Sequence, residues 1–245
     1  MKYDKINLMV PTYKRVKNGK LPRFIESVFK HTSDIDNICF SFLVNYEDDE
    51  TLNYLNNFKN SGPYMIQILQ ESERSPHLGK FYNHLYDNSR YDKPKIIVSM
   101  VGDDMEFLTS GYDLAILNAI NKCNGMGIVY CNDDFVQGKK LCVNLFTTRK
   151  LVEATRFPFM CEKFQAYYID TVWMEVGKRL NLLHYLDHVK IKHHHMSAKK
   201  SNVDETAQRL QKVKLNFSKG LKEVKQYIKP IIKNLQGVKL CPGKK

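Results

Sequence analysis

Hydrophobic positions follow two alternating patterns along the first two thirds of the chain. Short runs of β-branched and aromatic residues predict strands, and apolar residues at three- and four-residue spacing between them predict helices. The expected strands span residues 6–11, 38–45, 65–69, 96–100 and 127–131, and the expected helices span 22–30, 51–58, 80–88 and 112–121. This alternation predicts an α/β fold, Rossmann-like, with a mostly parallel central sheet and helices on both faces.

The pattern becomes irregular after residue 132. We expect a strand at 141–146, a helix at 169–180 and an alternating strand at 189–195. Residues 203–228 have apolar side chains at helical spacing and predict an amphipathic helix, which Pro230 is expected to end or kink. We therefore divide the chain into a body of residues 1–196 and a C-terminal helical extension of residues 197–245.

Charge separates the same two parts. The chain has 245 residues and a net charge of +12, and residues 196–245 contain 13 basic and 3 acidic residues, a net charge of +10. We expect the C-terminal helix to pack its apolar stripe on the body and to direct its lysines outward. Peripheral membrane contact through this basic helix is the alternative, because basic amphipathic helices bind anionic lipid surfaces.

Composition places the chain among ordinary globular proteins. Hydrophobic residues make up 43% and charged residues 26%. No apolar run approaches the roughly 18 residues of a membrane span, and the first residues lack the apolar core of a signal peptide. The six cysteines show no Cys-x-x-Cys spacing and are expected to be reduced thiols. We expect a cytoplasmic protein, with a peripheral membrane location as the alternative.

Two adjacent acids, Asp103 and Asp104, follow the apolar run at 96–100. Like charges side by side repel each other, so folding alone gives no reason for them. Ligands of open α/β sheets collect outside the carboxyl ends of the strands, where this pair falls. A divalent cation between the acids and a polyanion accounts for the pair, and a solvated turn is the simpler alternative.

Other polar segments are expected at the same edge of the sheet. An aromatic ring can stack on a base, a guanidinium can bind phosphates, and an amide can pair with a base or ribose. The start of the helix near residue 80 favours anions. The residues that we expect to contact a nucleotide are Pro11, Thr12, Tyr13, Arg15, Asn45, Gly79 and Lys80.

The order of these motifs resembles that of nucleotide-sugar glycosyltransferases of the GT-A fold, and family 2-type enzymes most of all. The matching elements are Pro-Thr-Tyr at 11–13, Gly-Lys-x-x-Asn at 79–83 and the acidic motif after the fourth strand. The resemblance covers residues 5–195. It implies a nucleotide-sugar donor, with a UDP-sugar favoured, a glycan, lipid-linked or protein acceptor, and Mn²⁺ or Mg²⁺ between the acids and the diphosphate.

The acidic motif departs from the Asp-x-Asp common in such families, because Gly102 occupies its first position. The resemblance therefore makes Asp104 the principal metal ligand and gives Asp103 a contact with the ribose or the metal. It also implies a metal or diphosphate contact from the histidines at 193–195. Strand geometry places His193 and His195 on one face and His194 on the other, and a solvated strand end is the alternative.

An inverting transfer needs a carboxylate that takes the proton of the acceptor hydroxyl. We assign this role to Asp170, which begins the helix at 169–180 at a place comparable to the base of the resembled family. An aspartate there also complements the helix dipole, which is the simpler interpretation. Glu162 is the nearest competitor, and Asp133 and Asp134 are weaker ones.

Two alternatives from other classes remain. A nucleic-acid-binding protein would use the basic C-terminal segment, but the acids at the strand end argue against such a surface on the body, so a nucleic-acid partner is not expected. A nucleotidyltransferase on a similar fold usually has a glycine-rich loop after its first strand, and residues 11–13 do not form one.

Overall fold

The computed structural model describes residues 2–72, 77–91, 95–134, 138–164, 168–194, 217–238 and 240, with only the backbone of 217 and 218. The strands are β1 (Lys5–Thr12), β2 (Ile38–Asn45), β3 (Met65–Glu71), β4 (Ile96–Met100), β5 (Met105–Phe107), β6 (Ile128–Asn132), β7 (Leu145–Thr148) and β8 (Leu183–His193). The α-helices are α1 (Lys20–His31), α2 (Asp49–Asn60), α3 (Leu78–Asp87), α4 (Tyr112–Lys122), α5 (Arg149–Thr155), α6 (Ile169–Leu180) and α8 (Phe217–Leu235).

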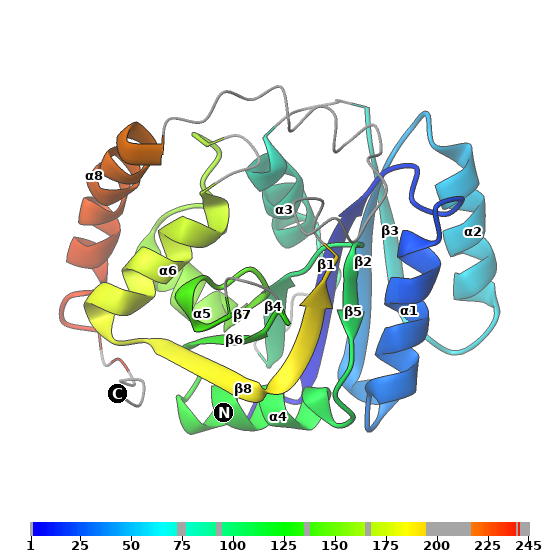
Figure 1. Ribbon diagram of the computed structural model, residues 1–245, viewed down its shortest axis with the longest axis horizontal. Helices are drawn as coiled ribbons and strands as arrows, with labels where there is room; N and C mark the ends of the chain where they lie inside the picture. Colours follow the sequence, from blue (N-terminus) through cyan, green and yellow to red (C-terminus); the bar gives the residue numbers. More distant parts are fainter. Residues whose placement is uncertain are drawn as a thin grey trace.

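These strands form one sheet in the order β3-β2-β1-β4-β7-β6-β8-β5, with helices around it (Figure 1). The first half is parallel: β1 pairs with β2 and β4, and β2 pairs with β3. Seven of the eight residues of β2 are buried, as expected for a parallel strand covered on both faces. The predicted α/β fold with a mostly parallel sheet is confirmed.

The second half of the sheet is mixed. β7 runs antiparallel to β4 and β6, while β6 and β8 are parallel and β5 pairs antiparallel with β8. The sequence pattern did not predict β5 or α5, which have three and seven residues and are too short for a clear periodicity. β7 begins at Leu145, whereas the pattern predicted a strand from residue 141.

Two hydrophobic clusters lie on the two faces of the sheet. Successive residues of β1 point to opposite faces, so Met9 joins one cluster and Leu8 and Val10 join the other. The cluster of Leu8 and Val10 also contains side chains from α1, α2 and α4. The cluster of Met9 contains side chains from α3, α5, α6 and α8. The helices therefore cover both faces, as the sequence pattern predicted.

Helix α8 packs its apolar side against α6 and α5 (Figure 1). Its buried side chains are Val224, Ile228, Ile231 and Leu235. The helix continues through Pro230, so of the two expected effects, ending or kinking the helix, the first does not occur. Pro230 is exposed, and the carbonyl that loses its hydrogen bond belongs to the exposed Gln226, where water can replace the missing donor.

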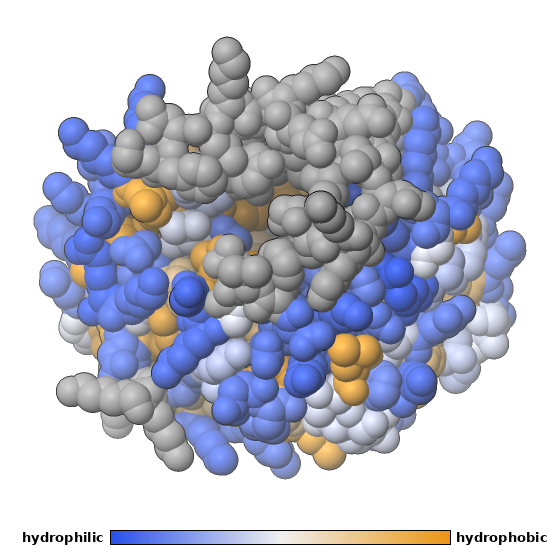
Figure 2. Space-filling model, viewed as in Figure 1, coloured by the Kyte–Doolittle hydropathy of each residue, from blue (hydrophilic) through white to orange (hydrophobic). Residues whose placement is uncertain are grey.

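The lysines of α8 face solvent on the side opposite its buried stripe. The exposed lysines are Lys219, Lys222, Lys225, Lys229 and Lys233. The predicted packing of this helix is thus confirmed over the residues described, whereas its expected beginning at 203 and the expected division at 196 lie outside them. On the face drawn in Figure 2, hydrophilic side chains predominate. None of the helices in the described residues is both long and apolar enough to cross a bilayer.

The packing of α8 predicts a difference between two identical substitutions. Leu235 is fully buried and Leu221 is 42% exposed on the same helix. Leu235→Ala should lower the free energy of unfolding by about 2–5 kcal/mol, because it removes buried methyl groups and leaves a cavity. Leu221→Ala should change it by less than about 0.5 kcal/mol. Urea denaturation of the full chain measures both, and equal effects would contradict this packing.

Candidate active site

A tight turn at the end of β4 presents the two acids. The Met105 N–H donates to the Gly102 carbonyl at 3.2 Å, which reverses the chain from β4 into β5. A Cβ atom on residue 102 would lie 2.6 Å from Asp104 Oδ1. Glycine at this position therefore leaves room for the Asp104 carboxylate in the orientation that it has here.

Asp103 is buried and faces the loop after β1. Its Oδ2 lies 3.8 Å from the Arg15 Nε, and both side chains are about nine-tenths buried. Burial raises the pKa of Asp103 to about 6, against the lowering effect of Arg15, and the charge of Asp104 raises it further. Lys20, at the buried start of α1, is a further cation that acts on both acids, and the sequence analysis did not identify it.

Asp104 lies against His193. The pairing of β5 with β8 sets Met105 opposite His193, and the His193 Nε2 is 3.4 Å from Asp104 Oδ1. Burial alone would raise the pKa of Asp104 and lower that of His193. Their mutual attraction reverses both directions: the pKa of Asp104 is held below its ordinary value and the pKa of His193 above it.

This pair suits a divalent cation that also binds phosphate. The described residues contain no cluster of three or more His, Cys, Asp or Glu side chains placed to hold a metal. Mg²⁺, however, usually takes only one or two carboxylates from the protein and completes its coordination with substrate phosphates and water. Two donor atoms 3.4 Å apart can both reach one ion, since metal–donor distances are about 2.1 Å. Asp104 and His193 therefore fit such an ion.

The neighbouring histidines differ in placement. His194 Nε2 lies 2.7 Å from Glu106 Oε2, a partner that the sequence analysis did not identify, and burial lowers the pKa of His194. Its side chain is thus engaged by β5 and not by the Asp104 carboxylate, as the alternation along a strand requires. His195, predicted to share the face of His193, lies outside the described residues.

The loops after β1 and β2 are joined through Asp48. The Asp48 carboxylate accepts from the backbone N–H groups of Lys14 and Thr51, so it caps α2 and holds the β1 loop at the same time. Lys14 has a φ of +53° and its ammonium lies 5.1 Å from the centre of the Tyr13 ring. Thr12 and Arg15 are buried beside the acids, and Pro11 and Tyr13 are half-buried.

Asn45 uses its side chain locally. Its Oδ1 accepts from the Glu47 N–H at 3.1 Å, which shapes the turn after β2. The adjacent Tyr46 is 57% exposed at this edge and was not singled out in the sequence. A contact of Asn45 with a base or ribose stays a prediction.

Gly79 and Lys80 lie in the first turn of α3, at the predicted edge. A Cβ on residue 79 would lie only 2.6 Å from the Cys161 carbonyl oxygen, so glycine permits the helix to meet the segment 159–162. Lys80 is exposed in that turn. Gly79 therefore allows α3 to pack closely on this segment, and its role in donor binding stays a prediction.

Asp170 lies in the first turn of α6, and its charge affects the pKa of His193. Its Oδ1 accepts from the Thr171 N–H at 2.7 Å and the Thr171 hydroxyl at 3.3 Å. Burial raises the pKa of Asp170 despite these hydrogen bonds, and its charge contributes to the raised pKa of His193. A carboxylate with a raised pKa accepts a proton more readily, and the role of Asp170 as the base stays a prediction.

Two of the competing acids are paired away from His193. Glu162 Oε1 accepts from Asn83 Nδ2 at 2.7 Å, and Asp134 forms an exposed ion pair with Lys190 at 3.7 Å. Asp133 is fully buried just after β6, its Oδ1 accepts from the Gly138 N–H at 2.8 Å, and its charge, like that of Asp170, raises the pKa of His193. These placements favour Asp170 over Glu162 and Asp134, and Asp133 stays an alternative.

No protein-family model matches the sequence, and no curated protein matches it either. Several solved structures, in contrast, are similar to this chain in fold. S. aureus TarS 1–349 in complex with UDP-GlcNAc has a TM-score of 0.65 at 14% identity, over 96% of this chain and 68% of that one. The mannosyltransferase PcManGT from Pyrobaculum calidifontis, in complex with GDP-Man and Mn²⁺, has a TM-score of 0.55 at 12% identity. The match covers 96% of this chain and 74% of that one. This chain spans only 44% of the length of a longer TarS structure. At these identities the likeness establishes the fold.

The geometry predicts that metal-dependent nucleotide binding requires the Asp104 carboxylate. In the wild type, Mn²⁺ and UDP together should raise the melting temperature more than the sum of their separate effects, because each ligand improves the site of the other. Asp104→Asn should lose this extra shift. The matched control is Asp134→Asn, an exposed acid that should keep it. An extra shift that persists in Asp104→Asn would contradict the assignment.

Proposed function

We propose that this protein is a metal-dependent glycosyltransferase that moves a sugar from a nucleoside-diphosphate donor to an acceptor hydroxyl. The observation that carries the proposal is the Asp104–His193 pair, placed beyond the carboxyl end of β4 in a GT-A-type fold. An ion held by two side chains keeps positions for phosphate oxygens, which a purely structural metal site would not need.

The donor that we favour is a UDP-sugar. The half-buried Tyr13 and the buried Arg15 lie at the sheet edge that also carries Asp103, so a ring and a cation are present for a base and a diphosphate. Among the structural neighbours, TarS is described with UDP-GlcNAc and PcManGT with GDP-Man. These complexes support a nucleotide-sugar as the class of donor.

In this proposal Asp104 and His193 hold Mn²⁺ or Mg²⁺, with Asp103 and His195 as the further predicted ligands. Such an ion stabilises the negative charge that develops on the departing nucleoside diphosphate. His193 would bind it as the neutral imidazole, the form in which a ring nitrogen can coordinate a metal. The neighbour PcManGT, which is in complex with Mn²⁺, supports a divalent metal.

Asp170 acts as the base in this scheme. Its carboxylate takes the proton of the acceptor hydroxyl while that oxygen bonds to the anomeric carbon and the bond from this carbon to the phosphate oxygen breaks. The products are the glycosylated acceptor, protonated Asp170 and the nucleoside diphosphate, and the anomeric configuration is inverted. The acceptor class that we propose is a glycan, a lipid-linked saccharide or a protein.

The direct test of the proposed function is a panel of nucleotides and nucleotide-sugars in thermal-shift assays. UDP, UDP-GlcNAc, GDP and GDP-Man are each added to the full chain with and without Mn²⁺. We expect a metal-dependent shift with the UDP compounds. The alternative class, nucleic-acid binding, predicts instead a shift with DNA or RNA that falls steeply with salt.

Replacing Asp170 should separate chemistry from donor binding. Asp170→Asn should lower the turnover number by about 10²–10⁴-fold, because the amide cannot take the acceptor proton. Donor affinity should stay within about twofold, since the base acts on the acceptor. The rate of UDP release and the Kd for UDP measure the two effects, with Asp134→Asn as the control. Unchanged turnover in Asp170→Asn would place the base elsewhere.

The lysine face of α8 is proposed to contact anionic membranes. Lys222, Lys225 and Lys229 follow one stripe of the helix, opposite its buried side. Changing these three to glutamine should weaken binding to phosphatidylserine-containing vesicles by about a hundredfold, at about 1 kcal/mol for each lysine. Vesicle sedimentation measures this.

The control for the membrane prediction carries the same change on the opposite face of the sheet. Lys30, Lys59 and Lys122 are exposed on α1, α2 and α4, and their change to glutamine should affect vesicle binding far less. Equal loss in the two triple variants would show a diffuse charge effect, and no loss in the α8 variant would rule out this face.

A further inference from the structure

The segment 159–162 contacts two helices, α3 and α6. We call the carboxyl ends of the strands, where Tyr13, Arg15 and the two acids lie, the donor edge. On one side it meets α3, whose first turn carries Lys80. On the other side it meets α6, whose first turn carries Asp170. The segment therefore joins the start of α3 to the start of α6 through direct contacts, and both helix starts take part in the proposed reaction.

Asn83 makes the contact with α3. Its Nδ2 donates to the Met160 carbonyl at 3.0 Å and to Glu162 Oε1 at 2.7 Å, and its Oδ1 accepts from the Met160 N–H at 2.7 Å. The amide thus pairs with the backbone of Met160 as a neighbouring strand would. Asn83 is only 5% exposed, so losing these bonds leaves buried polar groups without partners.

Two further contacts fix the same junction. The backbone of Gly79 lies so close to the Cys161 carbonyl that a methyl group would not fit. The His77 ring nitrogen Nδ1 is 2.9 Å from the Glu162 carbonyl oxygen. The start of α3, from His77 to Asn83, is therefore in contact with three consecutive residues of the segment, 160–162.

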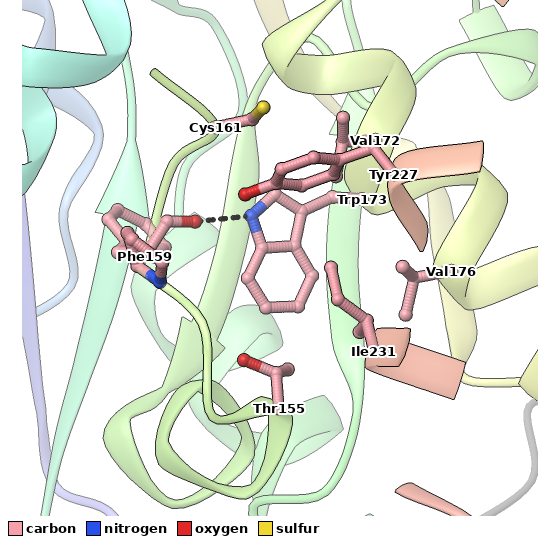
Figure 3. Close-up of a pocket in the computed structure, with 9 residues that line it drawn as sticks. Thr155, Phe159, Cys161, Val172, Trp173, Val176, Tyr227 and Ile231 are labelled. Carbon is pink, nitrogen blue, oxygen red and sulfur yellow. Dashed lines mark hydrogen bonds between the residues drawn. The ribbon is translucent and has the colours of Figure 1, made fainter. Parts of the chain in front are cut away.

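The other end of the segment is attached to α6. Trp173 Nε1 donates to the Phe159 carbonyl at 2.8 Å, and Figure 3 shows the indole nitrogen directed at that oxygen. Trp173 is one helical turn after Asp170, on the same side of α6. The chain of contacts runs from α3 through Asn83 and Met160 to Phe159, Trp173 and the start of α6.

Beneath this segment the interior is closely packed. A cavity of about 10 Å³ is lined by Phe159, Cys161, Trp173, Tyr227 and neighbouring apolar groups (Figure 3). That volume is about the space of a single water and is too small for a sugar or a lipid chain. Helix α8 closes this side, and Asn234 Nδ2 donates to the Thr155 carbonyl at 2.7 Å. The segment is therefore a scaffold between helices.

We propose that Asn83 is a positioning residue that sets Asp170 relative to the donor edge by holding residues 160–162 against α3. This inference rests on the proposed function and adds a residue to it that touches neither donor nor acceptor. A displacement of about 1 Å in a reacting group can lower a rate by about 10²-fold. Loss of this junction should therefore reduce turnover and leave nucleotide binding unchanged.

The test replaces the amide by a carboxylate. Asn83→Asp keeps an acceptor for the Met160 N–H but removes the donor and sets two carboxylates against each other at Glu162. With UDP-GlcNAc and Mn²⁺, its rate of UDP release should fall by about a hundredfold while the Kd for UDP stays within about twofold. Adding Glu162→Gln to this variant supplies a donor to the introduced carboxylate and should recover part of the rate.

A second readout needs no activity. Cys161 is buried in the segment and Cys131 is buried in β6. Asn83→Asp should speed alkylation of Cys161 by N-ethylmaleimide by about tenfold, because it favours local opening of the segment. Cys131 should stay protected, which excludes global unfolding. Gly79→Ala displaces the segment by contact alone and should have the same effect on Cys161. The control is Asn56→Asp, an exposed amide on α2.

Each outcome decides a separate point. Faster alkylation of Cys161 together with slower UDP release and unchanged UDP binding supports the proposal. Unchanged alkylation in Asn83→Asp, or faster alkylation with unchanged UDP release, overturns it, as does equal exposure of Cys131. A wild type that releases no UDP contradicts the proposed function instead, and the alkylation of Cys161 then still decides whether Asn83 holds the segment.

Discussion

The candidate site depends on the antiparallel pairing of β5 with the end of β8. Only three residues of β5 take part, yet they set Met105 opposite His193 and bring an imidazole to the Asp104 carboxylate. The His194 N–H also donates to the Asp104 carbonyl at 2.9 Å, and the His194 ring bonds Glu106. Without this pairing Asp104 would lose its imidazole partner, although Arg15 and Lys20 would still face the two acids.

The charges of the site are balanced in two groups. Asp103 faces the cations Arg15 and Lys20, and Asp104 faces His193. Burial disfavours every one of these charges, so each is tolerated only because an opposite charge lies beside it. A divalent cation and a diphosphate would add charges of both signs to this arrangement. Under the proposed function the two would bind together, so that their opposite charges largely offset each other within this balanced site.

Much of the fold follows from the sequence, and the parts that do not have physical reasons. Long apolar runs such as Ile38–Asn45 and Ile96–Met100 were placed within a residue, because buried parallel strands have a strong pattern. The short strand at Met105–Phe107 was missed because three residues show no period, although it determines which histidine meets the acids. Asn83 stood in the quoted Gly-Lys-x-x-Asn motif, but its partners are backbone groups 77 residues away, which no local pattern encodes.

The most direct test of the central claim is pulsed electron paramagnetic resonance of Mn²⁺ bound to the protein with UDP. A histidine ligand couples its ¹⁴N nucleus to the electron spin of the ion, and UDP places ³¹P near it. We predict both couplings in the wild type, a reduced ¹⁴N coupling in His193→Gln, and loss of the histidine ¹⁴N coupling when His195→Gln is added, with the ³¹P coupling retained in both variants. A wild-type spectrum without ¹⁴N coupling, or one that His193→Gln leaves unchanged, would contradict a metal site formed by Asp104 and His193.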